Sequence, residues 1–125
     1  MARSYDQFCP IARTLDIIGE RWTLLVLRDL SVFGKTRFSE LQESLPGIPA
    51  RVLSDRLKKL TEQGLVARRV YSEHPLRAGY HLTEKGESLL PILGAIAQWG
   101  MDELLTEQER RIVLNHIPSG LLAQR

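Results

Sequence analysis

The sequence contains one cysteine among its 125 residues. A single cysteine cannot form a disulfide within the chain, and structural zinc sites use several cysteine and histidine ligands, so we expect neither. No run of about 18 consecutive apolar residues occurs, and the amino terminus lacks an apolar core of signal-peptide length. These absences argue against export and against a membrane span. We therefore expect a protein of the reducing cytoplasm.

Residue patterns for catalysis and metal binding are also absent. The histidines His74, His81 and His116 have no metal-ligand spacing with one another or with Cys9. No glycine-rich loop follows a predicted strand, and no serine or cysteine stands in a recognisable nucleophile elbow. A catalytic function has to be argued from a site, so we expect no enzyme, no metal and no cofactor.

The net charge is low, because 17 Lys and Arg residues oppose 15 Asp and Glu residues and leave a formal charge of +2. A nucleic-acid surface would therefore have to come from local clusters of Lys and Arg. With 43% hydrophobic residues, the chain has enough apolar material for one compact core. We expect a single domain over residues 1–125, with its core at 8–104 and a C-terminal helix and tail at 105–125.

The most informative stretch, residues 38–63, predicts two short helices separated by a tight turn. Ser39 and Gln42 have the spacing of a capping box, so the first helix is expected to start at Ser39. The Leu45-Pro46-Gly47 turn ends it, because proline cannot continue a helix and glycine adopts the left-handed conformation. Ile48-Pro49 then starts the second helix, since proline is favoured at the first helical position.

The second helix has two contrasting sides. Helical spacing predicts a buried stripe made of Leu53, Leu57, Leu60 and Gly64. The opposite side carries Arg51, Asp55, Lys58 and Glu62, flanked by Ser54 and Lys59. A charged face is most often only a solvated face. The tight turn before this helix and the predicted hairpin after it favour a DNA-binding helix instead.

Two helices and a short strand are predicted before this stretch. Residues 1–8 form a short arm, and Pro10 opens a helix that Gly19 closes. Residues 22–32 form a second helix that is too apolar for a surface position and should run through the core or between subunits. Residues 36–38 are expected to form a minimal strand.

A hairpin and two helices are predicted after it. Residues 65–71 and 79–82 form the strands, and residues 72–78 form the loop. Thr83 caps a long helix that runs to Leu104 and is kinked or interrupted at Pro91. A second capping box formed by residues 106–109 opens a short helix that ends near residue 115. Residues 118–125 are expected to be a loose tail.

This order of elements, mainly α with a small β-hairpin, is that of a winged helix-turn-helix. Its motifs, in chain order, are Cys9-Pro10, Leu15–Gly19, Trp22–Leu25, Arg37–Leu41, Pro46–Ile48, Leu53–Leu57, Gly64–Val66, a proline-arginine wing, Tyr80–Thr83 and Trp99-Gly100. Together they resemble the HxlR-type transcription regulators, which are relatives of the MarR type. Departures from the usual pattern are Glu20, Arg21, Leu76 and Ala78-Gly79. One proline fewer and one glycine more in the wing should make it more mobile.

The resemblance implies extra N- and C-terminal helices that form a dimer, and a homodimer that binds double-stranded DNA to control transcription in bacteria or archaea. Two-fold symmetry predicts a pseudo-palindromic operator. A redox signal, an electrophile or a small-molecule effector would be consistent with such a regulator, although no cluster of residues identifies its chemistry. The rival hypothesis is a winged helix used for protein–protein contact. It predicts neutral or acidic groups where Arg51, Lys58 and Arg77 stand.

DNA contacts are assigned to exposed positions near the predicted interface. Phosphate contacts are assigned to Arg37, Lys58, Lys59, Arg68 and Arg69. Base contacts are assigned to Pro49, Ala50, Arg51, Ser54 and Asp55. Arg77 at the tip of the wing is assigned to the minor groove. Arg56 has two readings, a DNA contact or a partner for an acidic neighbour inside the domain, because it lies close to the leucine stripe.

The predicted dimer surface combines the first helix with the apolar helix around Trp99. It consists of Ile11, Leu15, Leu93, Ile96, Trp99 and Leu104. The alternative is that Leu93, Ile96 and Trp99 fill the core of the monomer.

Cys9 also has two readings. At a helix amino terminus, with Arg13 one turn on, its thiolate is favoured, which would suit a redox or electrophile sensor. In the family that the chain resembles, a cysteine at this position is such a sensor in some members. Alternatively it is a small buried hydrophobe that does not react. As a sensor it could form an intersubunit or mixed disulfide, because the chain has no second cysteine.

Overall fold

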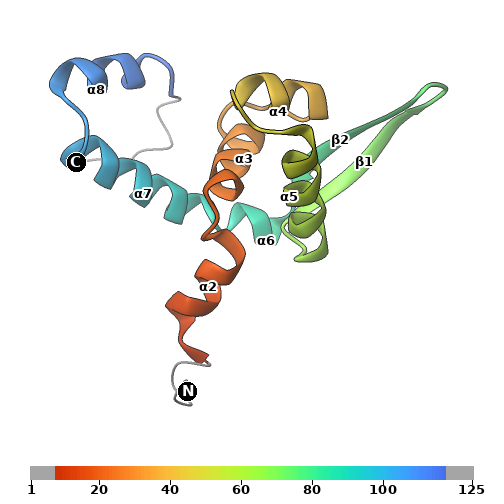
Figure 1. Cartoon of the computed structure of the whole chain (residues 1–125), viewed down its shortest axis with the longest axis horizontal. Helices are drawn as coiled ribbons and strands as arrows, with labels where there is room; N and C mark the ends of the chain where they lie inside the picture. Colours follow the sequence, from red (N-terminus) through yellow and green to blue (C-terminus); the bar gives the residue numbers. More distant parts are fainter. Residues whose placement is uncertain (1–7, 118–125) are drawn as a thin grey trace.

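The computed structural model describes residues 8–117, so the predicted tail and all of the predicted arm except Phe8 lie outside the described residues. The elements in order are α2 (Pro10–Ile18), α3 (Arg21–Ser31), α4 (Phe38–Ser44), α5 (Ala50–Glu62), β1 (Val66–Glu73), β2 (Leu76–Leu82), α6 (Glu84–Glu87), α7 (Leu90–Glu103) and α8 (Glu107–Leu114). Figure 1 shows a centre built from α3 to α6, from which α2, the β-hairpin and the α7–α8 pair project in three directions. The fold class is confirmed as mainly helical with a two-stranded wing.

The core lies between α3, α4, α5 and the base of the hairpin. The predicted stripe on α5 is buried, with Leu53, Leu57 and Leu60 at most 2% exposed. Val26 and Leu27 of α3 pack in the same cluster, which confirms that this apolar helix runs through the core. Gly64 was wrongly included in the stripe. It is exposed and has a φ of 76°, a left-handed conformation that ends the helix and favours glycine.

The start of α4 differs from the prediction. The helix begins at Phe38, and its first turn is capped by Glu40 rather than by the expected Ser39–Gln42 pair. The Glu40 carboxylate accepts hydrogen bonds from the backbone N–H of Arg37 at 3.0 Å and of Thr36 at 3.3 Å. These two donors, Arg37 first, lower the pKa of Glu40. Ser39 cannot be the cap, because the helix already begins at Phe38 and Arg37 is its N-cap residue.

The turn between α4 and α5 contains a left-handed glycine, as expected. Gly47 has a φ of 87°, the left-handed conformation that stops the chain from continuing as α4. Helix α5 begins at Ala50, and Pro49 is its extended N-cap rather than its first helical residue. The one-residue difference leaves the faces of α5 as predicted.

The strand predicted at residues 36–38 is wrong. The sheet of the described residues has two strands, β1 and β2. Thr36 contributes one backbone hydrogen bond to β2, in which the Tyr80 N–H donates to the Thr36 carbonyl at 2.8 Å. The chain cannot extend this pairing, because the next residue, Arg37, is already the N-cap of α4.

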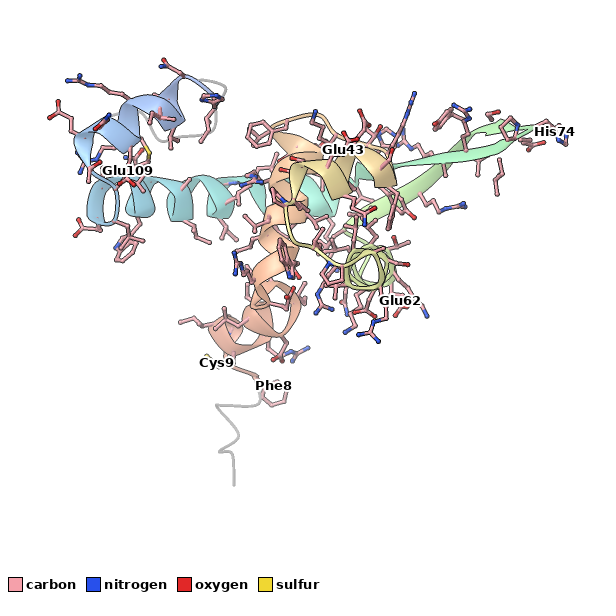
Figure 2. The ribbon with its side chains drawn as sticks, turned by 45° about the horizontal axis from the view of Figure 1, so that its top comes forward. Phe8, Cys9, Glu43, Glu62, His74 and Glu109 are labelled. Atoms are coloured by element: carbon pink, nitrogen blue, oxygen red, sulfur yellow. The ribbon has the colours of Figure 1, made fainter. Side chains whose placement is uncertain are left out.

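The hairpin is longer than predicted, and its connection is shorter. Residues 72–78 were expected to be a loop, but only His74 and Pro75 connect the strands. The ladder continues to the tip, where Glu73 pairs with Leu76. Polar composition therefore misled the prediction, since exposed hairpin strands carry polar residues as readily as loops do. The wing reaches far from the helices, with His74 at its tip (Figure 2).

The long helix predicted after Thr83 is interrupted, as Pro91 led us to expect. Thr83 caps α6 by accepting a hydrogen bond from the Gly86 N–H at 3.1 Å, and a second helix, α7, starts at Leu90. Gly86 is buried so tightly that an added Cβ would lie 2.1 Å from the Leu65 carbonyl oxygen, so only glycine fits. This contact joins α6 to the base of the hairpin.

The capping box of α8 is confirmed. The Thr106 hydroxyl accepts from the Glu109 N–H at 3.1 Å, and the Glu109 carboxylate accepts from the Thr106 N–H at 2.8 Å. None of the helices between residues 8 and 117 has the length and apolar character needed to cross a membrane.

Candidate nucleic-acid interface

The outer face of α5 is open to solvent. Its exposed residues, including the N-cap, are Pro49, Ala50, Arg51, Ser54, Lys58, Lys59, Thr61 and Glu62. The buried leucines lie on the opposite side of the same helix, so the core determines which side faces out. Among the described residues, Arg51 and Lys58 form no ion pair. Their charges are therefore available to a ligand.

Asp55 and Arg56 form a network beside this face. The Arg56 Nε donates to the Glu20 carboxylate at 2.7 Å, and its Nη1 donates to Asp55 Oδ2. Lys59 also contacts Asp55 Oδ2, at 3.3 Å. The Arg56 side chain is 20% exposed, whereas that of Asp55 is 46% exposed. Of the two readings for Arg56, the pairing with acidic neighbours is therefore the one found in the structure.

Glu20 belongs to the start of α3, far from α5 in the sequence. Its carboxylate accepts from the Trp22 N–H at 3.0 Å and from the Thr23 hydroxyl at 3.3 Å, so it caps α3 while it binds Arg56. Burial raises the pKa of Glu20, but the hydrogen bond and charge of Arg56 and the two local donors outweigh burial and leave the pKa lowered. Glu20 is thus held as a carboxylate.

The wing separates two arginines that were expected to act together. Arg68 and Arg69 are neighbours on β1, so they point to opposite faces of the hairpin. Arg69 borders a cleft with His81 and Glu87, on the side of α6 and α7. Arg77 lies on β2 next to the tip rather than at the tip itself, and it is exposed.

A contact joins the wing to the start of α4. The Arg37 guanidinium lies over the Tyr71 ring, 5.4 Å from its centroid, which is a cation–π distance. Tyr71 stands where the strand register shifts, between Val70 and Ser72. Such a bulge re-aims a side chain, here toward Arg37. Sequence reasoning assigned no role to Tyr71, because a bulge has no signal in this stretch.

The arrangement is that of a winged helix-turn-helix, and the comparisons with known proteins agree. The model of the family described as HxlR-like helix-turn-helix matches residues 17–109. The chain belongs to this family. It is 43% identical over 98 residues to YvaP of Bacillus subtilis strain 168, an uncharacterized HTH-type transcriptional regulator, and the match covers 78% of this chain and 90% of YvaP.

Solved structures give the same result. The redox regulator HypR in its oxidized form matches with a TM-score of 0.72 and 36% identity, over 78% of this chain and 100% of HypR. The reduced form of the transcriptional regulator YodB from B. subtilis matches with a TM-score of 0.66 and 33% identity, over 77% of this chain and 94% of YodB. The HxlR-like chain is therefore a transcriptional regulator with a DNA-binding helix-turn-helix, and no enzyme family is indicated.

The regulator exposes large apolar side chains on its projecting helices. Ile11 and Leu15 of α2 are 70% and 55% exposed. On and beside α7, Ile96, Trp99 and Leu104 are 48%, 61% and 69% exposed. The alternative that Trp99 and Ile96 fill the core of the monomer is therefore wrong. Leu93 is half-buried and lines an apolar groove of about 260 Å³ between α7 and α8.

Cys9 is the N-cap residue of α2, as expected, and Pro10 is the first helical residue. The cysteine is half-buried, so it is not the fully buried hydrophobe of the second reading. Its carbonyl accepts from the Arg13 N–H at 2.9 Å, which fixes the start of the helix. Figure 2 shows Cys9 beside Phe8 at the free end of α2, away from the centre of the fold.

The histidines are dispersed over the regulator. His74 lies at the tip of the wing, His81 on β2, and His116 after α8, where its Nδ1 is 2.8 Å from the Ile112 carbonyl oxygen. Among residues 8–117, no three His, Cys, Asp or Glu side chains gather as metal ligands would.

Sequence reasoning treated Glu20 only as a departure from the family pattern. Its position one residue before a helix was a signal for a cap, but its partner Arg56 lies 36 residues further on. We predict that Glu20→Gln lowers the free energy of unfolding at neutral pH by less than about 1 kcal/mol, because the carboxylate is partly exposed and its charge is screened. The amide oxygen keeps the hydrogen bonds and loses only the charge.

The pH dependence of this effect has a definite sign. Since the folded-state pKa of Glu20 is lowered, its charge stabilises the fold above the ordinary value of 4.5, and this contribution is lost as the pH falls below it. Chemical denaturation between pH 7 and pH 3 should show the variant and the parent converging in acid. Glu62→Gln is the control, because Glu62 forms no ion pair with another described residue. A difference that grows in acid would contradict the assignment.

Proposed function

We propose that this regulator is a homodimer that binds a pseudo-palindromic operator in double-stranded DNA, with α5 of each subunit in the major groove. The observation that supports this most is the exposed basic face of α5, backed by buried leucines. An α-helix fits the major groove, and a helix whose rear is packed in a core presents one face reproducibly.

Affinity comes mainly from phosphate contacts. The cations assigned to them are Arg37, Lys58, Lys59 and Arg68, which are all exposed. Lys59 is paired with Asp55 in the free protein, so it has to exchange that partner for a phosphate. Arg69 faces the other side of the wing, and we no longer assign it to this surface.

Base reading falls to the amino-terminal half of α5. Pro49 and Ala50 offer apolar contact to a thymine methyl, and Arg51 can pair bidentately with guanine. Ser54 and Asp55 follow one turn later as short polar readers. Arg77 is assigned to the minor groove, where a narrow A·T-rich track concentrates negative potential.

Dimerisation would cover the exposed apolar side chains of α2 and α7. A side chain such as Trp99 at 61% exposure is costly to leave in water and is typical of an interface centre. Pairing about a two-fold axis presents two copies of α5 to one duplex, about 34–36 Å or a multiple of that apart.

The rival function, protein–protein contact without DNA, is disfavoured by the charge of the outer face. Arg51, Lys58 and Arg77 are exposed cations, where a neutral or acidic surface would suit that rival. The absence of any salt-dependent retention on DNA would favour it.

We predict that Arg51→Ala costs about 1–3 kcal/mol of operator affinity and relaxes specificity at one base pair. Lys58→Ala should weaken binding to all sequences alike and lower the slope of log affinity against log salt by about one. Fluorescence anisotropy titrations at several salt concentrations, on DNA selected from a random pool, measure both effects.

The matched control is Arg111→Ala, which removes another exposed arginine from α8, where it pairs with Glu107 at 2.9 Å. Its affinity and salt slope should match those of the parent. If neither Arg51→Ala nor Lys58→Ala changes binding, both assignments fail.

The dimer is tested by sedimentation equilibrium. At micromolar concentration we predict a species of twice the 14.2 kDa chain mass. Trp99→Glu should shift the equilibrium to the monomer, because a carboxylate cannot be buried in an apolar interface without a partner. Circular dichroism controls for folding of the variant. A parent protein that sediments as a 14.2 kDa species would remove the dimer proposal.

A redox response is a second proposal for the same regulator. It is supported by the half-buried position of Cys9 at the N-cap of α2 and by the similarity to the redox regulator HypR. A helix N-terminus favours the thiolate, which is the reactive form of cysteine. Because α2 belongs to the proposed dimer surface, oxidation of Cys9 would change how the two subunits pack. It would thereby change the distance between their two α5 helices.

We predict that Cys9 reacts with a thiol reagent faster than free cysteine at neutral pH, and that treatment with diamide changes DNA affinity on the order of tenfold. Labelling rates followed spectrophotometrically, and binding before and after oxidation, measure the two effects. Cys9→Ser should show no response to diamide. Slow labelling together with unchanged binding would exclude a sensor.

A further inference from the structure

We propose that Arg56 is a positioning residue for base recognition, which holds the Asp55 carboxylate so that its Oδ1 accepts a hydrogen bond from the N4 amino group of a cytosine. This inference rests on the proposed function, since it requires α5 to lie in the major groove. It adds a residue that does not touch DNA and a base that the regulator prefers.

The Asp55 carboxylate is held on one side and open on the other. Its Oδ2 accepts from Arg56 Nη1 and contacts Lys59 Nζ at 3.3 Å. Its Oδ1 makes no hydrogen bond with another residue of the described chain. The side chain is 46% exposed on the helix whose outer face carries Arg51 and Ser54. One acceptor oxygen therefore remains available and has a fixed orientation.

Arg56 can impose that orientation because it is itself held from the core side. Its Nε donates to Glu20 Oε2 at 2.7 Å while its Nη1 reaches Asp55. The guanidinium is planar and rigid, so fixing one edge on Glu20 fixes the direction of the other. Glu20 is in turn fixed as the N-cap of α3. The lowered pKa of Glu20 keeps this anchor charged.

The preferred base follows from the chemistry of the available acceptor, Asp55 Oδ1. An ionised carboxylate can accept hydrogen bonds but cannot donate them. The major groove offers two base donors, adenine N6 and cytosine N4, and Asp and Glu recognise cytosine N4, because adenine places the N7 acceptor beside its N6 donor. Guanine offers only acceptors on that edge and would be rejected. An aspartate that is not held would gain less from cytosine, because its rotamers would have to be ordered on binding, so its discrimination would be weaker.

The test uses the full chain and duplexes selected from a random DNA pool by the parent protein. We expect a cytosine at one position of each half-site. Replacing that base pair should weaken parent binding on the order of tenfold. Arg56→Lys keeps the charge but cannot bridge Glu20 and Asp55 as a fork, so it should lose most of that discrimination while the salt slope stays the same.

A double-mutant cycle separates positioning from direct contact. Asp55→Asn should abolish the cytosine preference and favour adenine, which asparagine can bind through N6 and N7. If Arg56 acts through Asp55, adding Arg56→Lys to Asp55→Asn should change base preference no further. Glu20→Gln is a second, milder test of positioning, because it removes the charge that holds the Arg56 guanidinium but leaves Arg56 itself in place. It should reduce the same discrimination by a smaller factor.

The matched control is Arg28→Lys. Arg28 also donates through Nε to a carboxylate, that of Asp29 at 2.9 Å, but on α3 and away from the outer face of α5. This variant should keep the parent base preference even if its thermal midpoint falls. A loss of discrimination in Arg56→Lys or Glu20→Gln that is absent in Arg28→Lys supports positioning.

The possible results separate a failure of the role assigned to Arg56 from a failure of the proposed DNA-binding function. If the parent selects no sequence, the proposed sequence-specific function fails and the inference fails with it. If the parent selects a sequence and neither Arg56→Lys nor Glu20→Gln alters preference at any single base pair, the inference alone is overturned. Uniform weakening with a salt slope reduced by about one would also overturn it, because Arg56 would then be a phosphate contact.

Discussion

The burial of three leucines on one helix is the constraint on which the rest of the structure depends. Leu53, Leu57 and Leu60 are almost inaccessible to water, and burial of each stabilises the fold by about 1.5–3 kcal/mol. Because a helix turns once in about 3.6 residues, anchoring these three positions leaves Arg51 and Lys58 outside. The functional face is thus a consequence of core packing. It needs no interactions of its own to point outward.

Around this helix, polar contacts connect elements that the core alone would leave loosely related. Glu20 caps α3 and binds Arg56, which ties the start of one helix to the middle of another. On the other side, Thr36 is bonded to β2 and Arg37 lies over Tyr71, so the wing and the turn before α4 are joined. Each contact adds little stability, but together they limit the relative orientation of α5 and the wing, which recognition of DNA requires.

The projecting helices differ from the centre of the fold, because they leave large apolar side chains exposed. Helices α2 and α7 leave Ile11, Trp99 and Leu104 in solvent, although the core beside them is well buried. Their exposure, on helices that project away from the wing (Figure 1), fits a molecule divided into a surface for DNA and a surface for a second copy.

The sequence by itself determined the helices, their order and the outward face of α5, because helical periodicity and the turn residues Pro46 and Gly47 act over a few neighbours. Only the tertiary structure decided the length of the wing, the true cap of α4 and the partners of Arg56. The hairpin extends because strands pair across the turn, and Glu20 meets Arg56 across 36 residues of chain. Such contacts depend on how the elements pack against one another, which the spacing of residues within one element does not predict.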